Sequence, residues 1–301
     1  MDSKRFYAHG KLLLTGEYAV LDGALALGLP TQMGQSLRCV SQAEPGILRW
    51  ESHTDKGQIW FKADFRTADF SVIRATDPPT AVRLQQILTQ IRVRKPRFLP
   101  SGAAVCTRLE FPLNWGLGSS STLVSNLAAW AQVDPFWLQA ETLGGSGCDI
   151  ACAQHDKPVL FHRENGTPIS QEVDFRPAFA DRLYFVHLNR KQSTRSAIAA
   201  YRKKAHRGKW VETLTELTQA VIKAPDISAF ERLLTEHEQV VSRILNRPPI
   251  QAVYFADYPH VVKSSGAWGG DFALAVGDES APAYFRQKGF KTVVPYRQMI
   301  C

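Results

Sequence analysis

The stretch Asn114-Trp115-Gly116-Leu117-Gly118-Ser119-Ser120-Ser121-Thr122 decides the predicted fold, because it joins a strand-like run at 105–111 to an apolar helix. Gly116 and Gly118 accept backbone angles closed to other residues and let a ligand approach the main chain. The serines and Thr122 are good helix N-caps, and the free N–H groups and helix dipole at such a start favour an anion, most often phosphate. For this stretch alone, a glycine-rich turn capped by serine is the simpler alternative.

Length and composition describe a soluble globular protein. The 301 residues suffice for one large domain or two ordinary ones; 45% are hydrophobic and 21% are charged. A formal net charge of +8 admits anionic small molecules or nucleic acid as partners, and a solvated basic surface is the simpler explanation of the charge alone. Because the basic residues are scattered and no RNA-binding motif occurs, we expect no nucleic-acid partner.

The cysteines and the N-terminus bear on localisation. Five cysteines without Cys-x-x-Cys spacing favour free thiols in a reducing cytoplasm. The start of the chain lacks an apolar signal core, and no apolar run approaches ~18 residues. We therefore expect a cytoplasmic protein with no membrane partner, either a monomer or a homodimer.

The first half of the chain alternates strand and helix signals. Lys11 heads the apolar run 12–14, which predicts a buried strand; a lysine there is costly to bury unless it meets an anion, and an exposed strand end is the simpler alternative. Residues 35–65 alternate with period two, which predicts antiparallel strands. The patterns at 81–91 and 134–141 predict helices, the second with proline at its first position.

A second glycine cluster, Gly144-Gly145-Ser146-Gly147, precedes Asp149. A glycine-rich segment followed by an acidic residue predicts a turn that places Asp149 near the start of a helix. The alternative is a carboxylate that only favours the helix dipole, with an effect of up to ~1 kcal/mol.

The second half has an alternating α+β layout. Interruptions between 164 and 181 suggest a boundary, so we expect domains at 1–165 and 166–301. Strand 183–188 leads to helices at 209–223 and 226–245, and 261–276 reads as a strand, a glycine loop and a strand.

Four of these segments, in this order, resemble the motifs of the GHMP kinases, a family that includes galactokinase, homoserine kinase and the mevalonate-pathway kinases. They are Gly10 to Val20, Gly116 to Ser120, Ser146 to Asp149, and Ser264 to Asp271. The resemblance spans essentially the whole chain. It implies an α+β two-domain GHMP kinase fold, with an N-terminal α/β domain of the ribosomal-protein-S5-like type and a C-terminal ferredoxin-like α+β domain.

The resemblance also implies roles for single residues. Lys11 and Asp149 would be catalytic, with Asp149 receiving or orienting the acceptor's proton and Lys11 stabilising the developing charge. Ser120 would ligate Mg²⁺, and Glu141 is the nearest further carboxylate for the ion. The nucleotide-binding set would be Asn114, Gly116, Leu117, Gly118, Ser119, Ser120 and Ser121. The substrate-binding set would be Glu17, Tyr18, Ser146, Gly147, Lys191, Ser193, Thr194, Gly266, Ala267, Gly269 and Asp271.

The implied reaction is phosphoryl transfer from ATP, with Mg²⁺, to a small anionic acceptor. Tyr18 and Asp271 resemble phosphomevalonate kinases more than mevalonate kinases, which makes phosphomevalonate the expected acceptor and mevalonate the alternative. Trp268 replaces a glycine of the Ser264 to Asp271 motif, where it would narrow the pocket for the acceptor. A related decarboxylase and a non-catalytic nucleotide-binding protein are the remaining alternatives.

Overall fold

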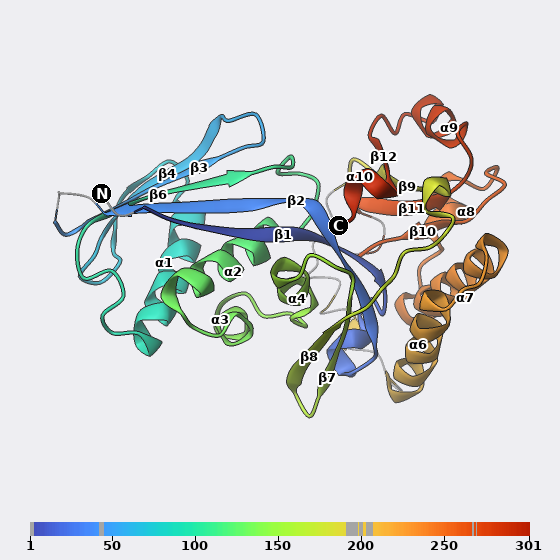
Figure 1. The fold of residues 1–301 in the computed structure, drawn as a ribbon, viewed down its shortest axis with the longest axis horizontal. Helices are drawn as coiled ribbons and strands as arrows, with labels where there is room; N and C mark the ends of the chain where they lie inside the picture. The colour runs from blue at the N-terminus through green and yellow to red at the C-terminus, as the bar shows by residue number, and fades with distance from the viewer. Residues whose placement is uncertain are drawn as a thin grey trace. The chain divides into compact units, whose positions relative to one another are not determined.

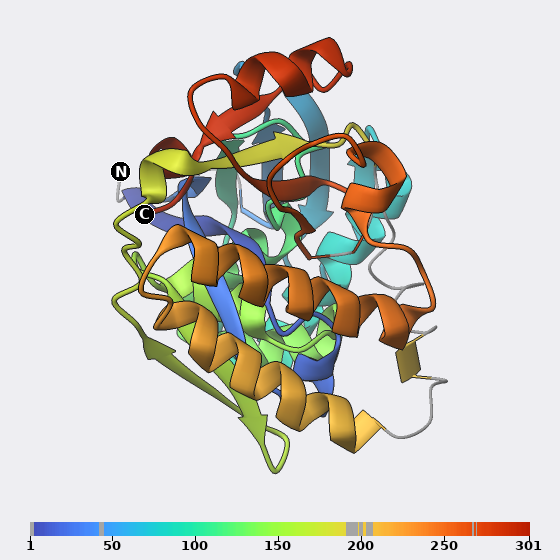
Figure 2. The ribbon, with the colours of Figure 1, turned by 90° about the vertical axis from the view of Figure 1, so that its right-hand side faces the viewer.

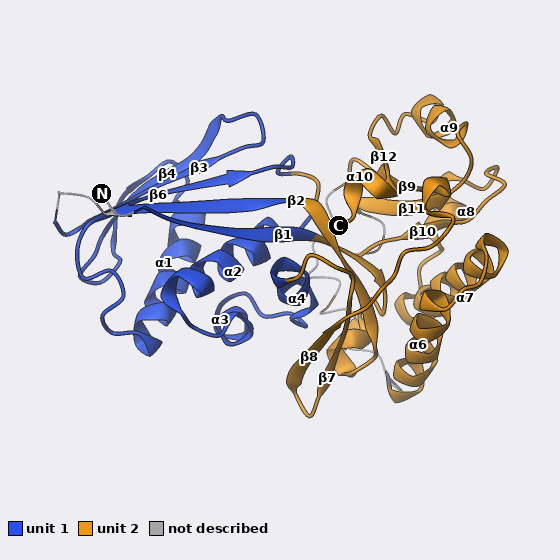
Figure 3. Cartoon of the chain, viewed as in Figure 1, with its two compact units in different colours: residues 1–10, 33–113, 117–154 blue, residues 11–32, 114–116, 155–301 orange. Residues whose placement is uncertain are grey.

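The chain forms two compact units in a computed structural model that describes residues 3–41, 45–190, 198, 201–202, 207–266, 268 and 270–301 (Figures 1 and 3). Unit 1 comprises residues 1–10, 33–113 and 117–154, and unit 2 comprises 11–32, 114–116 and 155–301. The units are interleaved in sequence, and strands β1 (Ser3–Thr15) and β2 (Ala26–Ser41) contribute residues to both. The division into domains 1–165 and 166–301 stays a prediction.

Unit 1 is a sheet with helices on one face (Figure 1). Its strand order is β5-β4-β3-β6-β2, in which only β3 and β6 run parallel. Alternating residues of these strands pack against the helices, as the period-two pattern predicts. The elements are β3 (Ile47–His53), β4 (Ile59–Arg66), β5 (Val72–Ala75), β6 (Ala103–Leu109), α1 (Pro78–Arg94), α2 (Ser119–Ala131), α3 (Pro135–Thr142) and α4 (Cys148–Gln154).

Two helices of unit 1 lie where the sequence predicts them, although α1 begins at Pro78, three residues before the predicted start. Asp77 caps α1 by accepting a hydrogen bond from the Thr80 N–H at 3.2 Å, and Asp134 caps α3 through the Phe136 N–H at 2.9 Å. In both helices proline occupies the first turn, where a missing N–H costs nothing. The predicted helices at 81–91 and 134–141 are therefore confirmed.

Unit 2 is built around the antiparallel sheet β10-β11-β9-β12. Helices α6 and α7 form an antiparallel pair, which Figure 2 shows side by side. A second set of strands pairs residues 26–28 of β2 with β7, and β7 with β8. The elements are β7 (Val159–Glu164), β8 (Thr167–Glu172), β9 (Leu183–His187), β10 (Val262–Ser264), β11 (Phe272–Val276), β12 (Val293–Pro295), α6 (Arg207–Ile222), α7 (Ile227–Leu245), α8 (Ile250–Tyr254), α9 (Ala281–Gln287), α10 (Tyr296–Met299) and the 3₁₀ turns Ala19–Asp22 and Ala180–Arg182.

The helices of unit 2 lie close to their predicted positions, at 207–222 and 227–245 against 209–223 and 226–245. Strand β1 is longer than predicted, because it begins at Ser3 and runs through Lys11 rather than starting there. None of the described helices is long and apolar enough to span a bilayer.

Candidate functional site

The glycine loop of unit 1 ends at an uncapped helix start. Gly118 is the N-cap residue of α2 and has a left-handed backbone (φ 87°), and among the described residues no side chain caps this end. The expected serine cap is therefore wrong. The first-turn N–H groups from Ser119 to Ser121 are instead left for an external acceptor, because a helix cannot satisfy them internally.

The N-cap residue Gly118 has no side chain that could cap the helix, and the hydroxyl groups of Ser121 and Thr122 bond elsewhere. The Ser121 hydroxyl donates to Asp149 Oδ2. The Thr122 hydroxyl donates to Gln35 Oε1 at 2.7 Å, and the Asn126 amide donates to the Gln35 carbonyl at 2.8 Å. These contacts fix the start of α2 against β2 while leaving its N–H groups pointing out of the helix.

Asp149 is held by two neutral donors. Besides the Ser121 hydroxyl, the amide of Gln139 donates to Asp149 Oδ1 at 2.9 Å. Gln139 and Ser121 are buried, whereas Asp149 is partly exposed in the first turn of α4. The carboxylate is thus oriented without a fixed counter-charge in unit 1, and the Ser146 hydroxyl accepts from the Cys148 N–H at 3.2 Å in the turn before it.

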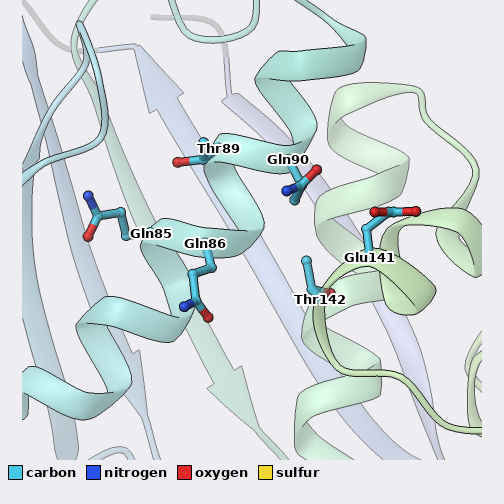
Figure 4. A pocket seen from close by; sticks show the side chains of 6 residues that line it. All are labelled: Gln85, Gln86, Thr89, Gln90, Glu141 and Thr142. Carbon is cyan, nitrogen blue, oxygen red and sulfur yellow. The ribbon is translucent and has the colours of Figure 1, made fainter.

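Glu141 lies on another side of α3. It is two residues from Gln139, a rotation of about 200° on a helix. Its side chain lines a polar hollow between α1 and α3, together with Gln85, Gln86, Thr89, Gln90 and Thr142 (Figure 4). The structure therefore does not bring Glu141 to Asp149. Among the described residues, no group of three or more His, Cys, Asp and Glu side chains forms a metal site.

In unit 2 the motif that begins at Gly116 meets the motif Ser264 to Asp271. A Cβ placed on Gly116 (φ 67°) would lie 2.1 Å from Asp271 Cγ, so any other residue at 116 would require this carboxylate to shift. Asp271 itself is fixed at its backbone, where its N–H donates to the Arg190 carbonyl at 2.8 Å and its carbonyl accepts from the Leu188 N–H at 2.7 Å.

The residues before Gly116 are anchored by His187, which the sequence analysis missed. Its Nε2 lies 3.1 Å from the Asn114 carbonyl, and its Nδ1 lies 3.1 Å from Asn189 Oδ1. Trp115 packs edge-on against Phe272 with ring centroids 5.3 Å apart. This buried histidine at the end of β9 holds the Asn114 end of the loop.

Lys11 lies beside the third glycine loop, which is the glycine-containing turn of the Ser264 to Asp271 motif. A Cβ on Gly266 (φ 68°) would lie 3.9 Å from Lys11 Nζ, which places the ammonium group at this turn. Lys11 belongs to unit 2 and Asp149 to unit 1, so their pairing stays a prediction.

Two of the predicted substrate ligands are buried. Glu17 is 1% exposed and is bonded to Lys263, and Tyr18 is 6% exposed and packs near Tyr201 with ring centroids 5.8 Å apart. Trp268 is 2% exposed within the same apolar cluster as Tyr18, so in unit 2 it fills the core. Lys191, Ser193, Thr194, Ala267 and Gly269 lie outside the described residues.

No family model and no curated protein matches the sequence, whereas solved structures match over nearly the whole chain. The Methanococcus jannaschii mevalonate kinase has a TM-score of 0.71 at 13% identity, over 97% of this chain and 96% of that one. A Streptococcus pneumoniae phosphomevalonate kinase in complex with phosphomevalonate and AMPPNP has 0.68 at 16%, over 96% of each. The Lactococcus lactis galactokinase complexed with galactose has 0.69 at 12%, over 95% and 88%.

These similarities establish the fold. The predicted two-domain α+β fold of the GHMP kinases is confirmed, because three kinases of that kind superpose over almost their entire length.

Gly116→Ala tests the contact between the motifs. The added methyl group meets the Asp271 carboxylate, so we expect a loss of about 2–3 kcal/mol in the free energy of unfolding, measured by urea denaturation. Gly57→Ala is the matched control, since Gly57 also has a left-handed backbone (φ 76°) but has no atom within 4 Å of the added Cβ. It should lose only about 1–2 kcal/mol from its backbone angle. Equal losses in the two variants would contradict the close contact.

Proposed function

We propose that the protein is an ATP-dependent small-molecule kinase whose 116–121 loop binds the nucleotide phosphates. The observation that carries the proposal is the start of α2, where a left-handed Gly118 precedes three uncapped serine N–H groups. A helix N-terminus of this kind supplies N–H donors and a positive dipole end to an anion. The similarity in fold to small-molecule kinases supports the same conclusion.

Mg²⁺ would be held together with the nucleotide rather than by a preformed cage. Magnesium keeps water ligands and uses one or two carboxylates plus substrate phosphates. Ser120, which is exposed at the start of α2, would supply one hard oxygen atom to such an ion, and the phosphates and water would supply the others. When bound, the ion would neutralise phosphate charge.

Asp149 is proposed to orient the acceptor hydroxyl and take its proton. Ser121 and Gln139 already hold both carboxylate oxygens, so the group needs little reorganisation when substrate binds. Lys11 would stabilise the charge that develops on the transferring phosphoryl group.

The proposed acceptor is phosphomevalonate, with mevalonate as the alternative. Tyr18 and Asp271 carry this proposal through the family resemblance. Because Tyr18 is buried in unit 2, its influence would come through the packing of the turn that follows β1.

ATP binding is tested by Gly118→Val. A β-branched residue is strained at φ 87° and screens the N–H groups of α2, so AMPPNP binding measured by calorimetry should be lost. Gly166→Val is the control, because Gly166 has φ 82° with no neighbouring atoms within 4 Å, in the β7–β8 turn. Unchanged nucleotide affinity in folded Gly118→Val would contradict the assignment.

The acceptor is tested by comparing kcat/KM for phosphomevalonate, mevalonate, homoserine and galactose. We expect the highest value for phosphomevalonate, with ADP and diphosphomevalonate as products. A higher value for mevalonate would transfer the assignment to mevalonate kinase. Release of CO₂ from diphosphomevalonate, with ATP consumed, would indicate the decarboxylase instead.

Lys11 and Asp149 are tested as a pair. Asp149→Asn removes the proton acceptor and should lower kcat by ~10²–10⁴-fold. Lys11→Met keeps the apolar stem and should lower kcat while nucleotide binding survives. If the two groups act as a unit, the double variant is far less impaired than the product of the single losses. Fully multiplicative losses would show that they act independently.

A further inference from the structure

Four ionisable side chains are buried together in unit 2. Lys263 and His237 are 0% exposed, Glu17 is 1% exposed and Glu238 is 3% exposed. They come from the turn after β1, from α7 and from β10. Charged groups without water are costly unless they are paired and hydrogen-bonded, so each of these groups must be accounted for by its neighbours.

Lys263 is the centre of this cluster. Its Nζ donates to Glu17 Oε1 and, at 2.8 Å, to the carbonyl of Ser264. Glu238 Oε2 lies 4.0 Å from the same Nζ. Glu238 Oε1 accepts from the Ser264 N–H at 3.1 Å and from the Ser264 hydroxyl at 2.8 Å. Ser264 is thus held at its N–H by Glu238 and at its carbonyl by Lys263.

His237 adds no positive charge. Its Nε2 accepts a hydrogen bond from the Gly16 N–H at 3.0 Å, and a ring nitrogen that accepts carries no proton. Burial, and then the charge of Lys263, lower the pKa of His237 well below its ordinary value. The 3.4 Å approach of Nε2 to Glu17 Oε2 is therefore not an ion pair. The ring instead fixes the turn that contains Glu17.

The cluster therefore holds one ammonium group and two carboxyl groups. Burial raises the pKa of Glu17 to about 7, although Lys263 opposes this, and burial also raises the pKa of Glu238. Tyr18 faces the cluster from the same turn and stays neutral, because burial and the Glu17 charge raise its pKa while Arg247 opposes them. One proton shared by the two carboxyl groups makes the cluster neutral, which is the state that a site without water favours.

The cluster is connected to Lys11 through two segments of the chain. Glu17 is in the turn that ends β1, the strand that carries Lys11. Ser264, whose peptide groups the cluster holds, is two residues before Gly266, where Lys11 Nζ lies. The buried groups therefore hold the end of the strand that carries Lys11 and the start of the loop beside its ammonium group.

We propose that Glu17 is a positioning residue rather than a substrate ligand: with Glu238 it shares one proton around Lys263, and the cluster fixes the third glycine loop beside Lys11. Its role in catalysis rests on the proposed kinase function, whereas the shared proton does not. If the two carboxyl groups share one proton, replacing either glutamate by glutamine should remove the uptake of that proton on folding. The two variants should therefore show the same change in the pH dependence of unfolding.

The test is the pH dependence of thermal unfolding for the wild type, Glu17→Gln and Glu238→Gln, without substrates. Because the folded pKa of Glu17 is raised from 4.5 to about 7, the stability due to the bound proton is complete below about pH 4.5 and is lost as pH rises to about 7. Each glutamine variant has no such proton to lose, so its stability should not fall over this pH range for this reason. The Tm of each variant minus that of the wild type should therefore rise by about 5 °C or more between pH 5 and 8.

Surface and charge controls complete the experiment. Asp257→Asn, at an exposed pair with Lys288 (2.8 Å), should give a curve parallel to that of the wild type over this range. Lys263→Met leaves two carboxyl groups without a cation, so a folded variant should lose more stability with rising pH than the wild type does. If Lys263→Met fails to fold, the two glutamine variants still decide. Curves for both that run parallel to the wild-type curve would overturn the shared proton.

Kinetics then separate positioning from substrate contact. Glu17→Ala removes the hydrogen-bond partner of Lys263, so we expect kcat to fall at least tenfold with an unchanged KM for the acceptor. Glu17→Gln keeps the shape of the side chain and should restore part of that loss. A KM raised tenfold or more, with an unchanged stability profile, would make Glu17 a substrate ligand and overturn the proposal. Absence of any kinase activity in the wild type would refute the proposed function, while the unfolding curves would still test the proton.

Discussion

The ammonium group of Lys263 has no access to water, and much of unit 2 is arranged around that constraint. A buried cation needs a negative partner and carbonyl oxygens, and it obtains them from the turn after β1, from α7 and from its own strand. Residues separated by up to 246 positions are thereby brought into contact. The glycine loop after β10 starts from a peptide group that is already fixed on both sides.

In unit 1 a charged group is held in place while it remains open to solvent. Asp149 is partly exposed and is held by a hydroxyl group and an amide, neither of which carries a charge. A carboxylate oriented in this way keeps its negative charge available for a ligand, whereas Glu17 is buried beside Lys263 and shares one proton with Glu238. The two acids appear in similar turns of the sequence, but burial and the charge of the partner give them different chemistry.

Local patterns were sufficient for most elements. Asp226 is followed by a helix with an apolar stripe, and α7 begins at Ile227 with the Asp226 carboxylate accepting from the Ala229 N–H at 2.8 Å. Such signals depend on a few adjacent residues, which a sequence displays directly. The two glycine loops were also predicted correctly as turns, because Gly116, Gly118 and Gly266 all have positive φ.

Long-range partners were not predictable in the same way. No residue near Glu17 in the sequence indicates that Lys263 is its partner. Gln139 and Glu141 lie two residues apart on a short helix, and the sequence alone does not show which of them faces Asp149. A carboxylate is the side chain that the sequence favours as a metal ligand, so Glu141 stays a prediction for that role, whereas the amide at 139 is the group that reaches Asp149. His237 lacks any motif, and its role depends on the approach of Gly16 from 221 residues away.

The fit of Gly116 beside Asp271 links two positions that are 155 residues apart in sequence. A methyl group at 116 has no room while the acid is at 271, so natural replacements at the two sites should occur together rather than singly. Distant relatives are therefore better recognised by scoring the two positions jointly than by treating each as an independent column. A sequence that keeps both residues keeps the contact between the two loops, whereas a sequence that keeps only one of them does not.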